Sequence, residues 1–223
     1  MAELTGGAPA PKPQVDLAAA REAFERVQAR AGEAGLRAHA AHASFGLAAA
    51  AMAREEWQEA AQGYERYFAQ ARASADGFEP PLLGVAYAHY HAGLAEYQQR
   101  RAVPAQRRLQ AYLGAVASFA ELDIYTPDGF GGKTYTDYDV EVQRQRRWVV
   151  SGRCQHGAHR MLVSVHEVLA SHAGDDEAAA GAALSAAVEH GEAALRLAWE
   201  EAQRVEGGEC LARLLAALGR HEG

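Results

Sequence analysis

Apolar residues recur three and four positions apart along most of this chain, and this spacing constrains its fold more than any other feature. In the first such segment, Leu17, Phe24 and Val27 fall on one face of a helix, and Asp16 stands where a helix N-cap is needed. Glycine, proline and aspartate then divide the sequence into segments of helical length. The pattern predicts an all-α protein.

Short turns between the segments favour an array of antiparallel helical hairpins. The predicted hairpins cover 36–73, 82–120 and 137–206, and Gly207 and Gly208 are expected to end the last of them before a short final helix. Residues 1–15 are rich in Gly, Pro and Ala and predict a flexible arm, so that 16–223 forms a single helical domain. The glycine-rich segment 121–136 predicts a long loop or a small hairpin inserted into that domain.

One predicted hairpin carries a familiar set of residues. Leu47 and Ala48 lie on its first helix, Trp57 stands before the second helix, and Ala60 and Tyr64 lie on the second. With these residues, the segment 41–74 resembles a tetratricopeptide unit, a helical hairpin repeat of about 34 residues. It departs from the pattern at Ser44 and Ala51, where large aromatic residues are usual, and it lacks the closing proline. The resemblance implies a right-handed stack of hairpins that binds peptides or proteins on its concave face; the alternative arrangement is an irregular helical bundle.

Composition excludes several classes of protein. The net charge of −7 and the pI near 5.8 argue against a nucleic-acid binder, which would present a basic surface. No apolar run is long enough to span a bilayer, and the amino-terminal residues lack the hydrophobic segment of a secretory signal. The two cysteines form no CxxC pair, which favours free thiols in a reducing compartment. We therefore expect a cytoplasmic protein with no membrane partner.

Aromatic residues form a stripe at helical spacing in the segment 82–98, and its members are Tyr87, Tyr90, His91, Leu94 and Tyr97. Such a stripe is either core between hairpins or the wall of a groove for a peptide or small apolar ligand. In the second case Lys133, Arg144 and Arg147, in or just after the glycine-rich insertion, are candidates to meet an acidic residue of the partner.

Three histidines, His156, His159 and His166, lie along one flank of a predicted helix beside Cys154. They are the candidate ligands if the chain binds a metal, but Cys154 points away from them and a further helix would have to complete the site. The stretch 166–172 lacks the i, i+4 histidine spacing of a zinc protease. We therefore expect no metal and interpret the flank as hydrogen-bonded histidines.

No motif in the sequence indicates a reaction. The segment "GFGGKT" at 129–134 has proline where a phosphate-binding loop needs its first glycine, and no nucleophile elbow or dinucleotide-binding fingerprint occurs. The sequence favours a non-enzymatic interaction or scaffold module that binds a protein segment with acidic residues and uses no cofactor. The alternative is a helical bundle, an enzyme among the options, that binds a metal, cofactor or small ligand at a His- and Tyr-lined pocket. A homo-oligomer is compatible with both.

Overall fold

The computed structural model describes residues 16–73, 82–121 and 151–219, and every regular element in these ranges is an α-helix. The prediction of an all-α fold is confirmed there. In chain order the helices are α1 (Leu17–Glu33), α2 (Arg37–Ala53), α3 (Trp57–Ala73), α4 (Leu82–Gln98), α5 (Ala102–Glu121), α7 (Gly152–His172), α8 (Glu177–Leu197) and α9 (Glu201–Leu218). The predicted arm 1–15 and the insertion from 122 to 136 lie outside the described residues.

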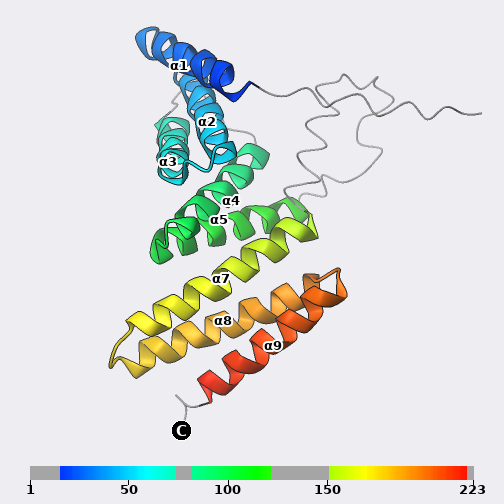
Figure 1. The fold of residues 1–223 in the computed structure, drawn as a ribbon. Helices are drawn as coiled ribbons and strands as arrows, with labels where there is room; N and C mark the ends of the chain where they lie inside the picture. Colours follow the sequence, from blue (N-terminus) through cyan, green and yellow to red (C-terminus); the bar gives the residue numbers. More distant parts are fainter. Residues whose placement is uncertain (1–15, 74–81, 122–150, 220–223) are drawn as a thin grey trace, which may run out of the picture.

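Each described helix packs against the next one, so the helices follow one another from α1 at one end to α9 at the other (Figure 1). The segments predicted as hairpins, 36–73 and 82–120, contain the packed helix pairs α2–α3 and α4–α5, and α7–α8 forms a third pair. Helix α4 also touches α2 on one side and α7 on the other. The first helices of the three hairpins, α2, α4 and α7, are therefore in contact in succession along the array.

Three of the turns between these helices have the same backbone structure. Each has one residue with a left-handed backbone, at Gly35 (φ 68°), Glu55 (φ 60°) or Arg100 (φ 59°). In each, the N–H of the next residue donates to the carbonyl five positions earlier, with distances of 2.8 Å for Leu36, 3.0 Å for Glu56 and 3.0 Å for Arg101. This bond closes the carboxyl end of the preceding helix and reverses the chain. Glycine meets the backbone requirement in only one of the three turns.

Small residues let the two helices of each hairpin approach closely. A Cβ on Gly63 would lie 2.8 Å from the Cβ of Ala48, and one on Gly93 would lie 2.7 Å from Cγ of Leu109. Both separations are too short for a methyl group, so glycine is required at these crossings. Larger side chains, among them Tyr64 and Tyr112, are fully buried beside them.

Two predicted helix boundaries are wrong. The hairpin predicted for 137–206 was expected to end at Gly207 and Gly208, but α8 ends at Leu197 and α9 begins at Glu201, with both glycines inside α9. The break lies at Ala198, which is extended (ψ 125°) and buried, and a Cβ on Gly207 would lie 3.2 Å from Cδ1 of Leu195. No unbroken helix runs from 137 into α7, because Ser151 is extended (φ −62°, ψ 145°) and its hydroxyl accepts from the Cys154 N–H, which caps α7.

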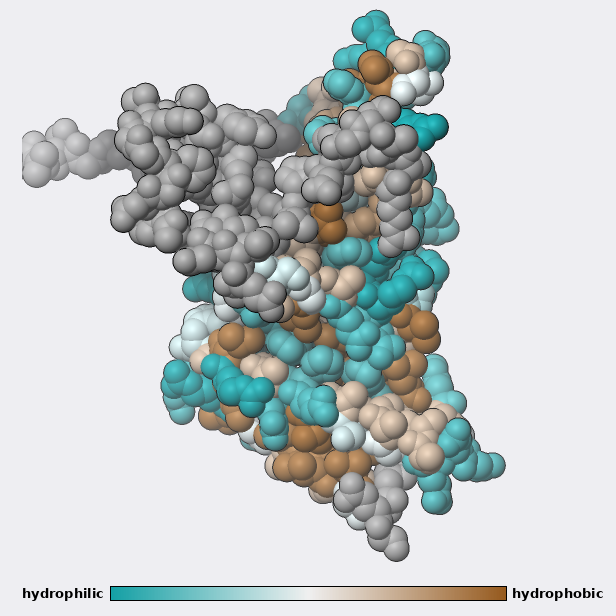
Figure 2. All heavy atoms as spheres, turned by 180° about the vertical axis from the view of Figure 1, so that it is seen from behind, coloured by the Kyte–Doolittle hydropathy of each residue, from teal (hydrophilic) through white to brown (hydrophobic). Residues whose placement is uncertain are grey.

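The surface is mixed in character. Seen from behind, apolar side chains gather between charged ones over the lower, carboxyl-terminal helices (Figure 2). Among the described residues that follow α8, Trp199, Val205 and Leu215 are exposed apolar side chains. Within the described ranges, no helix combines the length and the apolar character needed to cross a bilayer.

Candidate binding groove

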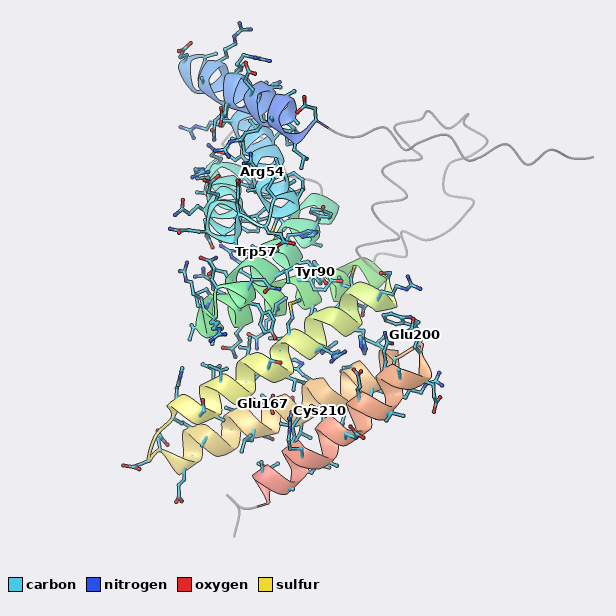
Figure 3. The ribbon with its side chains drawn as sticks, in the orientation of Figure 1. Arg54, Trp57, Tyr90, Glu167, Glu200 and Cys210 are labelled. Atoms are coloured by element: carbon cyan, nitrogen blue, oxygen red, sulfur yellow. The ribbon has the colours of Figure 1, made fainter. Side chains whose placement is uncertain are left out.

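The predicted tyrosine stripe lies mostly in the interface between the α4–α5 hairpin and α7. Tyr90 packs edge-on against Tyr112 of α5, with ring centroids 5.1 Å apart, and a Cβ on Gly157 of α7 would lie 3.0 Å from its hydroxyl oxygen. Figure 3 shows Tyr90 in this position between the hairpin and α7. Burial raises the pKa of Tyr90 to about 12. The structure therefore favours the packing alternative for Tyr90.

Tyr87 and His91, which belong to the same stripe, are also packed between helices. The ring of His91 lies 4.2 Å from that of Tyr87, and burial lowers the pKa of His91 to about 4. The pKa of Tyr87 is raised, mainly by burial. Both side chains contribute large aromatic area between helices, so they act as part of the core.

Tyr97, at the carboxyl end of the stripe, is different because it lines a groove. The groove lies between the α4–α5 turn and α7 and has a volume of about 620 Å³. Its lining contains Tyr97, other apolar side chains, and polar and basic ones. Besides Tyr97, the lining residues are Gln98, Arg100, Arg101, Ala102, Ser164, Val165, Val168 and His172. Val165 is 2% exposed and forms apolar floor, whereas Val168 is 39% exposed and offers apolar surface to a ligand.

The electrostatic character of the groove is basic. Among the described residues, two arginines and no carboxylate line it. Arg101 forms an ion pair with Glu96, with 3.1 Å between Nε and Oε2, and Glu96 is only 4% exposed. Burial raises the pKa of the Glu96 carboxyl, and the nearby Arg101 opposes that shift. Arg100 is exposed and makes no ion pair with any described residue, so its guanidinium is available to a carboxylate.

The predicted histidine flank packs against α8. His156 donates from Nδ1 to the carbonyl oxygen of Ala194 at 2.9 Å, and the Nδ1 atoms of His159 and His190 lie 3.0 Å apart. The ring of His166 lies 5.5 Å from that of His190. Burial lowers the pKa of His159 to about 4 and also lowers those of His166 and His190.

These histidines do not form a metal site in the structure. Among the described residues, no group of three or more His, Cys, Asp or Glu side chains is placed to hold a metal ion. Cys154 points into the core cluster with Leu109 and Tyr112, away from the histidines, as predicted. The flank therefore serves the α7–α8 interface, with hydrogen bonds that the neutral rings can make.

The remaining predicted partner-binding residues, Lys133, Arg144 and Arg147, lie outside the described residues. Conversely, the sequence did not single out Val168 or His172. The groove forms where the α4–α5 turn packs against α7, and no local sequence pattern predicts this contact between distant segments. The one available signal was the arginine pair 100–101 directly after an aromatic stripe.

No protein-family model matches this chain, and no curated protein shows significant similarity to it. Its function must therefore be inferred from its own residues and their geometry.

Proposed function

We propose that the protein is an interaction module that binds a short partner segment in the groove between the α4–α5 turn and α7. The segment would place an apolar side chain against Val165, Val168 and Tyr97. An acidic residue beside it would meet Arg100 and Arg101. This chemistry agrees with the acidic partner that the sequence predicted, at a different set of basic residues.

The observation that carries the proposal is the composition of the groove. An aromatic ring and exposed apolar surface lie beside a guanidinium that no described carboxylate neutralises. Interfaces depend on a few such anchors, in which aromatic and arginine side chains are over-represented. The volume of about 620 Å³ fits a few side chains of a peptide rather than a folded domain face. The tetratricopeptide resemblance of 41–74 and a cytoplasmic location stay predictions from the sequence, and the groove lies outside the matched segment.

A random peptide library displayed on phage tests the proposal directly. We expect the full-length protein to enrich peptides in which Leu, Ile or an aromatic residue stands next to Asp or Glu. A synthetic peptide of the enriched sequence should then bind at least tenfold more weakly to the Val168→Asp and Arg100→Glu variants, measured by fluorescence anisotropy.

Matched controls are available on the same chain. Val205 is 53% exposed on α9, and Arg66 is exposed on α3, so Val205→Asp and Arg66→Glu change the same side chains at distant places. Both should bind like the wild type. Enriched peptides without acidic residues, or equal losses in all four variants, would show that the groove is not the binding site.

A further inference from the structure

A second, separate hollow lies between α7, α8 and α9. Its volume is about 220 Å³, and all three helices contribute to its walls. Glu167 of α7 and Cys210 of α9 lie across from each other in it, as Figure 3 shows. The hollow opens outward into a shallower one lined by Arg160, Glu206, Glu209, Cys210 and Arg213. Neither the tyrosine stripe nor the proposed binding groove uses these residues.

Cys210 is a free, half-buried thiol with a positive charge beside it. Nη2 of Arg213 lies 3.5 Å from Sγ of Cys210 and donates to it, and the same nitrogen lies 2.9 Å from a carboxylate oxygen of Glu167. The thiolate is the reactive form of a cysteine, and this guanidinium lies within hydrogen-bonding distance of the sulfur.

A second guanidinium lies at the same opening. Arg160 of α7 pairs with Glu206 of α9, with 3.3 Å between Nη1 and Oε2. The side chains of Arg160 and Arg213 are 57% and 65% exposed, and each forms one ion pair with a glutamate among the described residues. A guanidinium has five N–H donors, so both arginines can donate to a further carboxylate from a ligand.

A buried histidine gives independent evidence that the hollow is built for a ligand. His156 is 5% exposed and lines the hollow, and it shares one face of α7 with Arg160 and Glu167. Its Nδ1 atom is bonded to the carbonyl of Ala194, while its Nε2 atom has no hydrogen-bond partner among the described residues. Because Nδ1 donates its proton to that carbonyl, Nε2 is the remaining polar atom of the ring, and buried polar atoms are normally paired. A ligand with an N–H donor would satisfy it.

We propose that Cys210 is a site of reversible thiolation by a small, carboxylate-bearing peptide thiol of the glutathione class. The carboxylates of this ligand would meet Arg160 and Arg213, and an amide or amino N–H would donate to Nε2 of His156. The other cysteine does not compete, because Cys154 is 4% exposed in the core.

The chemistry is thiol–disulfide exchange with the oxidised form of the small thiol. The thiolate of Cys210 attacks one sulfur of the disulfide, a new bond forms between that sulfur and Sγ, and the original disulfide bond breaks. The second half of the small molecule leaves as a thiolate and takes up a proton from water. A reduced small thiol reverses the reaction, so no further oxidant is required.

Two small-molecule disulfides of opposite charge can show whether Cys210 reacts differently from an ordinary surface cysteine. The reduced full-length protein is incubated with oxidised glutathione or with cystamine, which lacks carboxylates and carries amines. Each rate of mixed-disulfide formation is followed by intact mass, assigned by peptide mapping, and divided by the rate for a synthetic peptide of residues 207–213. We expect modification at Cys210 rather than Cys154, and a higher normalised rate for oxidised glutathione than for cystamine.

Variants of the two arginines then test the carboxylate contacts. Arg160→Gln and Arg213→Gln should each lower the normalised rate with oxidised glutathione by about three- to fivefold, the effect of losing an exposed ion pair. The rate with cystamine should stay the same or rise in Arg160→Gln. In Arg213→Gln it should fall less than the rate with oxidised glutathione, because Arg213 also donates to the sulfur of Cys210. Because both side chains are mostly exposed, the variants should keep the wild-type circular dichroism spectrum. Equal normalised rates for the two disulfides, or equal effects of the variants on both, would overturn the proposal.

Discussion

At the scale of single residues, Glu55 and Arg100 adopt a left-handed backbone (φ 60° and 59°) that side chains disfavour, whereas Gly35 adopts it freely in the matching turn. The cost is about 1–2 kcal/mol for a residue with a Cβ. Both residues keep the turn because the hydrogen bond that follows closes the helix end. Arg100 also lines the proposed binding groove, so its turn positions a functional side chain, whereas Glu55 makes no ion pair with a described residue.

Replacing Glu55 with glycine should therefore stabilise the protein. We expect Glu55→Gly to raise the free energy of unfolding by about 0.5–1 kcal/mol, since relief of the backbone strain exceeds the extra entropy of glycine in the unfolded chain. Ala53→Gly, two residues earlier and still in α2, should lower it by about 1 kcal/mol. Urea unfolding followed by circular dichroism measures both. A loss of stability in Glu55→Gly would show that the side chain contributes more than its backbone costs.

At the scale of the helices, the interface of α7 with α8 contains ionisable rings that are neutral in the folded protein. The Nδ1 atoms of His159 and His190 lie 3.0 Å apart, so one ring must donate and the other accept. Burial is the main cause that lowers the pKa of His159 to about 4, and the neighbouring His190, Arg196 and His156 add to it. Burial likewise lowers the pKa values of His166 and His190, with Glu189 opposing.

These shifts predict how stability changes with pH. A histidine whose pKa is lowered by folding takes up a proton in the unfolded chain first, from its ordinary value of 6.5 downward. The free energy of unfolding should therefore be constant above that pH and should fall as the pH drops from 6.5 toward 4. Urea unfolding at a series of pH values should show a shallower decline in His159→Gln and an unchanged one in His39→Gln, where the side chain is exposed on α2. A decline of the same steepness in His159→Gln would contradict the assignment.

Helix positions could be predicted from the sequence because each helix carries its own pattern. Leu17, Phe24 and Val27 predicted the helix that is α1, and Asp16 caps it with a side chain that accepts from the N–H groups of Ala18 and Ala19. The break between α8 and α9 could not be predicted, because Ala198, Trp199 and Glu200 include no glycine or proline. That break depends on tertiary packing: the ring of Trp199 lies edge-on against His156 and under the guanidinium of Arg153, 5.1 Å from its carbon. The groove lined by Tyr97 could not be predicted either, because its two walls come from separate hairpins whose packing no local pattern specifies.

At the scale of the whole molecule, the protein is a linear array in which most contacts join neighbouring helices. In such arrays the stability of a terminal unit depends on a single interface. Helix α1 is the clearest case, because Ala31 is its only fully buried residue. Its other links to the array include the hydrogen bond from Gln28 to Ser44 and the ring of Phe24, which packs on Gly46 of α2.

Gly46→Ala should therefore release α1 without unfolding the rest. A Cβ at this position would overlap the ring of Phe24, so the ring must move and α1 loses this apolar contact with α2. Hydrogen exchange followed by mass spectrometry should show faster exchange in α1, with unchanged protection in α4, α5 and α7, because opening at one end need not propagate through the interfaces beyond it. Gly114→Ala is the matched control: a Cβ on Gly114 meets nothing within 4 Å, so exchange in α1 should not change. If Gly46→Ala instead raised exchange equally in α1 and α7, the helices would unfold as one cooperative unit rather than as a chain of neighbours.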